Sequence, residues 1–416
     1  MSRAVLALAL LALVLGGLLL SPLLGARERA TAAHPASAEP IEDSAPPRAT
    51  ATPRSEPRNP PSEPPPAPTL AAPVVAGPSA VVVRSVGELP GGVVAAVRGV
   101  AGVVGVAPVR AGAVLLTASR AADGAPVDVP AQGWGIPLDV IAVDPAEYAA
   151  VLPEAERSTV AALPPGGVLL CATSARVRGL SPGAVLEVGG VVLTVAGVID
   201  DALVGSAELV VHAQDAARLG VGGVRYALVQ VDGAVPGAVQ VVEQVVAGTP
   251  GVLNRDLGAW PWPPSWREVL PQAQVKERFG EFAVRPGAGR TMAQESGWAE
   301  QHVVTATVPL LGEVRCHREV IGPLADALGE LERTGLGNLV DPGDYAGCFS
   351  PRLIGAGAGP SRHAWGLAVD LNASRNPFGA PSTQDPRLVE VMERHGFGFG
   401  GRWPVPDAMH FEYRRL

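Results

Sequence analysis

The 416-residue chain has one lysine, three cysteines and few aromatic residues (4%), and these shortages exclude some classes of protein. Every basic residue except Lys276 is an arginine, and Ala273 stands three positions before that lysine. The Ser-x-x-Lys arrangement of one class of serine peptidases is therefore excluded. Basic residues total 32 against 40 acidic ones, a net charge of -8. Because nucleic-acid-binding proteins carry a basic stripe, we expect no nucleic-acid partner.

What the chain has in quantity is small apolar side chains. Hydrophobic residues make up 47% of it and charged residues 17%, so it can fill a sizeable core. At roughly 150 residues per domain, this length predicts two or three domains. Short Val-rich runs and segments of helical periodicity occur together, which indicates an α+β fold.

The first 26 residues contain a long uncharged run. Residues 4–24 are without charge, and 21 residues at 1.5 Å rise give about 31 Å, enough to cross a bilayer core. The apolar segment of a cleaved signal is usually ~7–15 residues, and no clear Ala-x-Ala site follows. We expect residues 1–26 to be a transmembrane signal anchor of a single-pass cell-membrane protein. The bulk of the chain then lies on the extracytoplasmic side, or is secreted if the segment is cleaved.

Residues 27–80 have a different composition, with 14 prolines in 54 positions. They show no apolar periodicity, so they cannot bury enough surface to offset the entropy of ordering. We expect a Pro/Ala-rich disordered linker.

Residues 81–256 are expected to form a separate α+β domain. Val185–Val188 and Val191–Val195 flank Gly189-Gly190, which predicts a hairpin because both glycines can take positive φ. No acid–base cluster or metal-ligand spacing occurs in this region, so we interpret it as structural or partner-binding. Further elements are expected as a helix near 91–99, strands at 103–106 and 114–117, and helices at 215–219 and 236–247.

Two runs in this region, AVDPAEY (142–148) and LSPGAVLEVGGVVLTVAGVIDD (180–201), carry a resemblance. They resemble the extracytoplasmic core domain of MacB- and FtsX-type ABC permeases. The resemblance implies an envelope protein partner for residues 81–256. The chain departs from that family because it lacks the additional membrane helices that a permease subunit needs.

A Trp/Pro linker, residues 257–267, marks the next boundary, because the prolines of AWPWPPSW (259–266) forbid a helix. Beyond it, residues 268–416 are expected to form the C-terminal domain. Apolar residues on one helical face predict a helix from about 320 to 331 with Gly335 as its C-cap, and a Val/Thr run predicts a strand at 303–308.

The cysteines divide into a pair and a single residue. Cys316 and Cys348 lie 32 positions apart in the C-terminal region and are expected to form a disulfide outside the cytoplasm. Cys171, in an apolar run, is expected to be a small buried side chain. A Cys–His hydrolase using Cys316 and the adjacent His317 is the alternative, but sequence neighbours rarely form that dyad.

Two C-terminal segments contain the candidate catalytic and metal-binding residues: SRHAWGLAVDLN (361–372) and PDAMHFEY (406–413). In each, apolar and polar residues alternate, which predicts strands. Gly366 lets the chain bend so that His363 and Asp370 converge.

The second strand brings His410 to the same polar face as Asp370, with Asp407 on the turn that precedes it. Two imidazoles and one carboxylate, with a fourth position left for water, are the ligand set of a catalytic zinc site.

These segments match the SxHxxGxAxD and DxxHFE motifs, and so resemble the zinc D-alanyl-D-alanine carboxypeptidase and L-alanyl-D-glutamate endopeptidase family of VanY-like peptidases. The run GFGFGGRWPVPDAMHFE (396–412) is similar to the endopeptidase-type branch. The resemblance implies a small antiparallel sheet with flanking helices, and peptidoglycan peptides as substrate. The residue roles that it implies are zinc (Zn2+) ligands at His363, Asp370 and His410, a general base at Asp407, and a substrate-facing cation at Arg352.

Three further polar residues in these motifs are candidates for supporting roles. Ser361 and Asn372 are expected to bind substrate or to support the ligands. Glu412, on the His410 face, is expected to orient that imidazole. A solvated strand carboxylate is an equal alternative for Glu412.

The sequence thus predicts a membrane-tethered zinc metallopeptidase that hydrolyses peptidoglycan stem peptides. The alternatives are a non-catalytic cell-wall- or zinc-binding protein, and a partner of an ABC-type envelope complex that acts mainly through residues 81–256. Carboxypeptidase and endopeptidase activity both stay open, since they depend on whether the loop 373–386 blocks the cleft.

Overall fold

The computed structural model describes residues 78–85, 87–259, 270–354, 359–403 and 405–415, which all fall in one compact unit. The expected signal anchor (1–26), the linker up to residue 77 and most of the Trp/Pro linker lie outside the described residues. Within them, no helix is long and apolar enough to cross a membrane.

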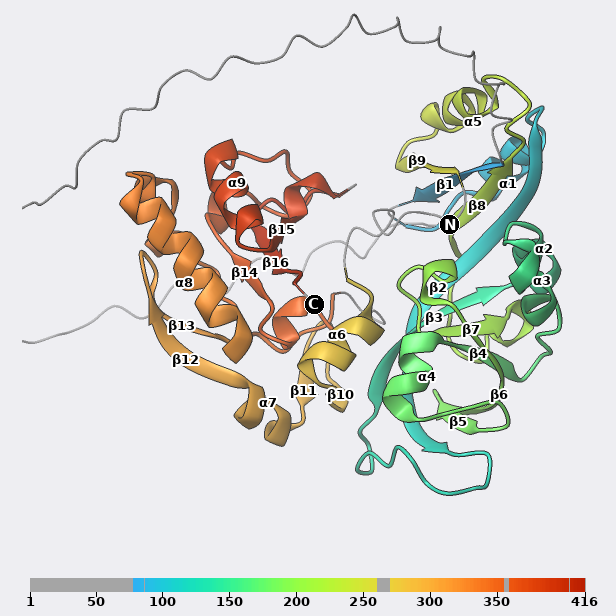
Figure 1. Cartoon of the computed structure of the whole chain (residues 1–416), viewed down its shortest axis with the longest axis horizontal. Helices are drawn as coiled ribbons and strands as arrows, with labels where there is room; N and C mark the ends of the chain where they lie inside the picture. The colour runs from blue at the N-terminus through green and yellow to red at the C-terminus, as the bar shows by residue number, and fades with distance from the viewer. Residues whose placement is uncertain (1–77, 86, 260–269, 355–358, 404, 416) are drawn as a thin grey trace, which may run out of the picture. The chain divides into compact units, whose positions relative to one another are not determined.

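A nine-stranded sheet dominates residues 79–259, in the order β3-β7-β4-β6-β5-β2-β8-β1-β9. A further pairing of β3 with β2 closes the first six strands into a ring. The longest strand, β2, belongs both to this ring and to the open part of the sheet (Figure 1). The strands are β1 Ser79–Ser85, β2 Val103–Arg120, β3 Ile136–Val143, β4 Gly167–Cys171, β5 Val185–Val188, β6 Val191–Ile199, β7 Leu209–His212, β8 Val224–Val231 and β9 Val252–Ala259.

The alternation of side chains along its strands explains how this ring of strands packs on both of its faces. Val168 and Leu170 of β4 belong to one apolar cluster, whereas Leu169 and Cys171 belong to another. Because successive side chains in a strand point to opposite faces, β4 is covered on both of its faces. The predicted hairpin is confirmed, with positive φ at both Gly189 and Gly190.

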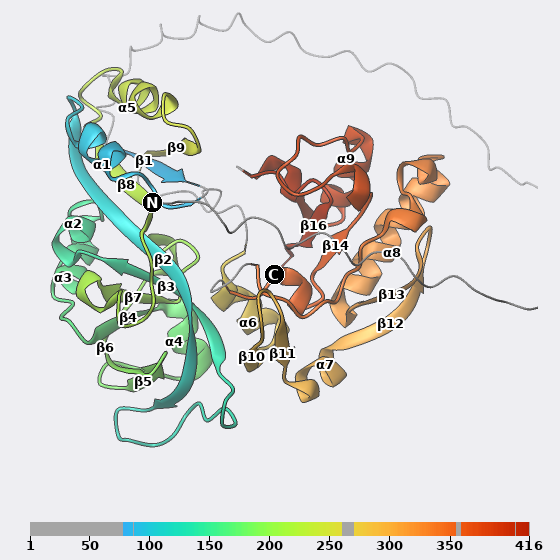
Figure 2. The ribbon, with the colours of Figure 1, turned by 180° about the vertical axis from the view of Figure 1, so that it is seen from behind.

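Helices cover the open part of the sheet. Helices α1 and α5 lie side by side next to β1, β8 and β9 (Figures 1 and 2), and Val93, Val97, Val242 and Val246 fill the cluster beneath them. The helices of this region are α1 Gly91–Arg98, α2 Pro145–Ala150, α3 Glu154–Ala161, α4 Ala172–Arg178 and α5 Ala238–Ala247.

Three expectations for this region need correction. The strands expected at 103–106 and 114–117 are parts of the single strand β2. The helix expected at 215–219 is wrong. Only a short 3-10 turn, Ala213–Asp215, forms there, because the buried Asp215 carboxylate accepts the Gly166 N–H and Gly220 turns the chain with a φ of 67°. The sheet also extends past the expected domain boundaries, from Ser79 to Ala259.

The C-terminal region is α+β, with three small antiparallel sheets: β10-β11, β12-β13 and β14-β16-β15. Its helices α8 and α9 pack against each other (Figure 2). Gly335 takes a φ of 75° just after α8, as its expected C-cap role requires. The elements are α6 Gln272–Phe279, β10 Val284–Pro286, β11 Met292–Gln294, α7 Ser296–His302, β12 Val303–Val308, β13 Gly312–His317, α8 Arg318–Arg333, β14 Ala368–Asp370, α9 Pro386–Arg394, β15 Phe397–Phe399 and β16 His410–Tyr413.

Helix α6 fastens this region to the nine-stranded sheet. Its Ala273 packs into one of the sheet's apolar clusters, and the Lys276 ammonium lies 2.8 Å from Glu208 Oε1, just before β7. After the helix, the Val284 backbone forms a bridge with Gly135. Residues 268–416 therefore do not pack independently of residues 81–256.

Candidate metal and catalytic site

A cavity of about 510 Å³ opens in the C-terminal region between the two motif segments. Its wall includes side chains from the chain around residues 352–370 and from residues 403–412. Most of the predicted site residues line it, namely Arg352, Ser361, Asp370, Asp407, His410 and Glu412.

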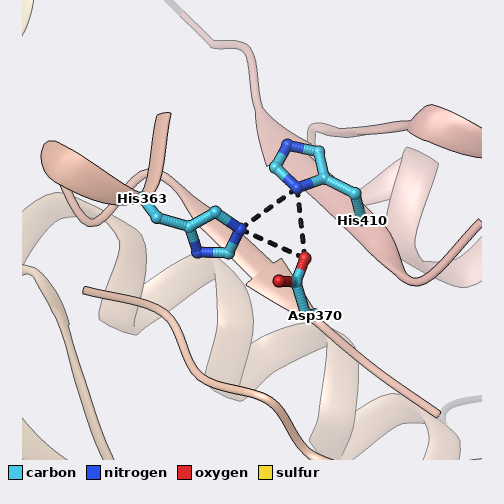
Figure 3. Close-up of side chains that lie close together, drawn as sticks. All are labelled: His363, Asp370 and His410. Carbon is cyan, nitrogen blue, oxygen red and sulfur yellow. Dashed lines mark hydrogen bonds and ion pairs between the residues drawn. The ribbon is translucent and has the colours of Figure 1, made fainter. Parts of the chain in front are cut away.

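Two imidazoles and a carboxylate converge beside this cavity (Figure 3). His363 Nε2 and His410 Nδ1 each lie 3.1 Å from Asp370 Oδ1, and 3.1 Å from each other. All three residues are buried. Among the described residues, these three form the one group of three or more His, Cys, Asp or Glu side chains placed to hold a metal ion.

Strand pairing places two of these residues. In the β14–β16 ladder Asp370 is directly opposite His410, so their side chains share one face. His363 comes from a short 3-10 turn, Arg362–Ala364, rather than from the strand. After the turn, Gly366 has a φ of 68°, and a Cβ there would lie 2.6 Å from the His317 backbone nitrogen. Only glycine fits at this bend, as the sequence indicated.

A backbone carbonyl fixes the orientation of the His363 ring. Its Nδ1 lies 2.8 Å from the carbonyl oxygen of Cys348, so Nδ1 carries the proton and donates it there. The Nε2 lone pair then faces Asp370 and His410. Cys348 is in turn joined to Cys316 by a disulfide. The third cysteine, Cys171, is buried, and burial raises the pKa of its thiol.

The charges at the cluster favour a cation. Burial alone would raise the pKa of Asp370, but its close contacts with the His363 and His410 rings hold it well below its usual range. Burial opposes a charged His410, yet the nearby carboxylates of Asp370 and Glu412 raise the pKa of that ring to about 9. In His363 burial prevails and lowers the pKa. An ionised carboxylate and two ring nitrogens converging within hydrogen-bond distance therefore fit a borderline-soft divalent metal such as zinc.

Asp407 lies in the cavity wall outside this trio. Its Oδ1 is buried with no hydrogen-bond partner among the described residues, and burial raises the pKa of the carboxyl. Its backbone carbonyl accepts the His410 N–H at 3.0 Å, which fixes the turn relative to the ligand. A carboxylate oxygen without a partner next to a candidate metal site is free to accept a proton.

Arg352 also contacts the cluster of His363, Asp370 and His410. Its Nη2 lies 3.3 Å from Asp370 Oδ2, the oxygen not shared with the two histidines. The guanidinium lines the cavity and is 29% exposed, so it remains accessible to a bound molecule.

Ser361 and Asn372 differ in their placement. Ser361 lines the cavity, and its hydroxyl accepts the His363 N–H at 3.4 Å. Asn372 is not part of the cavity wall. Its amide nitrogen donates to Leu339 O and Gln384 Oε1, and its amide oxygen accepts the Asp341 N–H. Its side chain is therefore engaged in holding three loops together, which fits the supporting role among the two expected for it.

Several cavity residues escaped prediction. Arg362 stands within the first motif, one position before His363, and its role was not recognised because its partners are distant in sequence. Phe378 belongs to the loop expected to border the cleft and is 66% exposed. Arg290 precedes β11, where no sequence pattern pointed to a site.

Residues 355–413 match the sequence family described as D-alanyl-D-alanine carboxypeptidase. The match confirms the resemblance on which the C-terminal motifs were interpreted. No curated protein is significantly similar in sequence to this chain.

Two solved structures are similar in fold. The periplasmic region of MacB from Actinobacillus actinomycetemcomitans is 10% identical, with a TM-score of 0.30, over 44% of this chain and 90% of that one. The extracellular domain of the noncanonic ABC-type transporter YknZ from Gram-positive bacteria is 12% identical, with a TM-score of 0.29, over 43% of this chain and 100% of that one. Both come from proteins of the kind that the sequence of the middle region resembles.

Proposed function

We propose that the protein is a zinc-dependent peptidase that hydrolyses peptidoglycan stem peptides at the 510 Å³ cavity. One observation carries the proposal. Three metal-binding side chains converge next to a carboxylate oxygen without a partner, within a segment that matches a carboxypeptidase family. Alone, the three buried side chains would fit a purely structural ion. Asp407 and the open cavity favour catalysis.

In the proposed mechanism His363, Asp370 and His410 would hold the ion. A zinc ion bound there would polarise the scissile carbonyl and lower the pKa of water. Asp407 accepts a proton from the attacking water at its unpaired Oδ1 and returns it to the leaving amine. Its raised pKa suits both steps, because a carboxyl held nearer to neutrality gives its proton back more readily.

Arg352 supplies positive charge where negative charge develops. Its guanidinium stands 3.3 Å from Asp370 and faces the cavity, so it can stabilise the oxyanion or grip a substrate carboxylate in a bidentate manner.

The test is to digest purified peptidoglycan with the full-length protein and to identify the new chain ends by mass spectrometry. We expect release of stem-peptide fragments, loss of activity with a chelator, and recovery with zinc. The released ends also distinguish carboxypeptidase from endopeptidase cleavage. If zinc binds but no peptide bond is cut under any condition, the site is a non-catalytic zinc or wall-binding module.

The setting of this activity is also a proposal. We infer that residues 1–26 anchor the chain in the cell membrane with the peptidase outside. The disulfide supports an oxidising compartment, because such bonds persist there. Fractionation of cells that express the full-length protein, with and without external protease, tests this orientation.

An envelope partner for residues 81–256 is a separate proposal. It depends on the sequence resemblance alone, and the peptidase reaction needs no such partner. Crosslinking of the full-length protein in membranes, followed by mass spectrometry, would recover components of an ABC-type complex if the proposal holds.

A further inference from the structure

Glu412 is a buried carboxylate in an unusual position. Its side chain is 1% exposed, yet neither oxygen has a hydrogen-bond partner within the described ranges. Two basic side chains approach its two oxygens: Arg362 Nε lies 3.5 Å from Oε1, and His410 Nε2 lies 3.9 Å from Oε2. The Glu412 carboxylate therefore stands between the Arg362 guanidinium and the His410 ring.

Arg362 is itself held in place on other sides. Its side chain is 11% exposed, its Nη2 donates to the Leu270 carbonyl, and its guanidinium carbon lies 5.7 Å from the centre of the Trp365 ring. These contacts hold the guanidinium on two sides, with its Nε 3.5 Å from Glu412 Oε1.

The Leu270 carbonyl belongs to the segment that enters α6, and α6 is bound to the nine-stranded sheet. Gln272 Nε2 donates to Pro137 O at 2.9 Å and to Glu208 Oε1 at 3.0 Å. Lys276 Nζ donates to the same two oxygens. Polar contacts, together with the short backbone segment 270–272, thus connect the sheet through Arg362 and Glu412 to His410.

We propose that Arg362 is a positioning residue for the metal site: it holds Glu412, Glu412 orients the His410 ring, and the docking of α6 on the nine-stranded sheet holds Arg362. The inference rests on the proposed zinc site and deepens it. A neutral imidazole has one N–H, and a partner at Nε2 leaves the Nδ1 lone pair directed at the ion. Residues 81–256 thereby contribute to ion binding without touching the ion.

The test measures zinc affinity of the full-length protein by competition with a chromophoric chelator, which needs no substrate. Outer partners of metal ligands typically change affinity by ~10–100-fold, and we expect a loss of this size in Arg362→Gln. Arg362→Lys, which keeps the charge, should lose less. Arg402→Gln is the matched control, because Arg402 forms a surface pair with Glu393 and should bind zinc like the wild type.

A double variant separates positioning from a general loss of structure. If Arg362 acts through Glu412, then Arg362→Gln added to Glu412→Gln costs little further affinity. The absorption spectrum of the Co²⁺-loaded protein should shift in Arg362→Gln, since it reports ligand geometry. Wild-type affinity and spectrum in Arg362→Gln would overturn the proposal. If that variant does not fold, the same two measurements on Arg362→Lys decide it, and wild-type values again overturn it.

The contribution of α6 has its own variant, Gln272→Leu. Couplings through such networks are about 2- to 30-fold in affinity, and we expect a loss of zinc affinity in that range. Unchanged zinc affinity in a folded Gln272→Leu protein would show that the docking of α6 on the nine-stranded sheet does not influence ion binding. Wild-type protein that binds zinc but cuts no peptide refutes the proposed function and leaves this inference standing. Wild-type protein that binds no zinc refutes both.

Discussion

Lys276, the one lysine of the chain, forms an ion pair with Glu208 in which both side chains are 1% exposed and the Nζ–Oε1 distance is 2.8 Å. The carboxylate also accepts from Gln272 and Ser174, and Arg178 lies 3.9 Å away. A buried cluster with several charges requires all of its members, because each charge loses its hydration on burial.

We therefore predict that Lys276→Met destabilises the protein strongly. Removing one partner of a buried pair typically costs about 3–5 kcal/mol, and Arg178, 3.9 Å from Glu208, compensates only part of the charge that remains. The double variant Lys276→Met, Glu208→Gln should recover part of that loss. Urea unfolding of both variants gives the comparison. A single variant within about 1 kcal/mol of the wild type would show that the cluster contributes little.

Asp407→Asn should separate binding from turnover. Because Asp407 is outside the ligand trio, we expect zinc affinity close to that of the wild type. We expect the cleavage rate to fall by about 10²–10⁴-fold, the usual contribution of a general base. Parallel zinc titration and peptide hydrolysis measure the two effects, and unchanged turnover would exclude Asp407 as the base.

The same carboxyl predicts the pH dependence of the reaction. Burial raises the pKa of Asp407, and the base must be ionised to accept a proton. Activity should therefore fall on the acid side at a pH above 3.8, the ordinary value for an aspartate. The pH profile of kcat/KM, taken at saturating zinc, tests this, and a limb at or below 3.8 would contradict it.

Asp139 lies on the nine-stranded sheet near Gly359, and its pKa predicts how the stability of the fold depends on pH. Burial and the nearby Glu208 carboxylate raise the pKa of Asp139 to about 6 from 3.8. Above pH 6 the residue is ionised in both the folded and the unfolded chain, and the folded form carries the penalty. That penalty disappears as the pH falls from 6 towards 4, where the folded form takes up its proton first.

Asp139→Asn should thus be more stable than the wild type at pH 7.5, by about 1–3 kcal/mol, since each pKa unit corresponds to ~1.4 kcal/mol. The two proteins should converge near pH 4. Melting temperatures of the pair between pH 4 and pH 8 provide the test. Parallel curves at all pH values would exclude an ionised Asp139 as the source.

The disulfide is expected to influence both stability and the site. Losing a cross-link over 32 residues costs ~3–4 kcal/mol in the loop-entropy model. Because the Cys348 carbonyl orients His363, the Cys316→Ser, Cys348→Ser double variant should also bind zinc more weakly. Chelator competition and thermal melting measure the two effects separately. Cys171→Ser is the control for thiol loss, and its zinc affinity should be unchanged.

Much of the site could be predicted because its pattern is local. His363 and Asp370 share one motif, His410 and Asp407 share another, and period-two alternation placed Asp370 and His410 on one face. Arg362 could not be assigned, because its partners Glu412 and Leu270 come from other parts of the chain. The contacts of Asn372 could not be predicted for the related reason that its side-chain amide is bonded to loops far away in sequence.

The fold shows the same division between local and long-range information. The glycine pair at 189–190 determines a hairpin by itself, since few residues accept that backbone. The helix expected at 215–219 failed because a buried contact between Asp215 and Gly166 overrides local propensity. The closure of β3 onto β2 depends on pairing between residues as far apart as Val109 and Val143, which no local pattern specifies.

The bond from the His363 ring to the Cys348 carbonyl gives thiol oxidation a second consequence. Joining the two sulfurs also steadies an imidazole needed to capture the ion. With both cysteines reduced, His363 would be oriented less firmly, and the affinity of the proposed site for zinc would be lower. In the proposed extracytoplasmic setting, this ligand would therefore become firmly oriented only after the chain reaches an oxidising compartment.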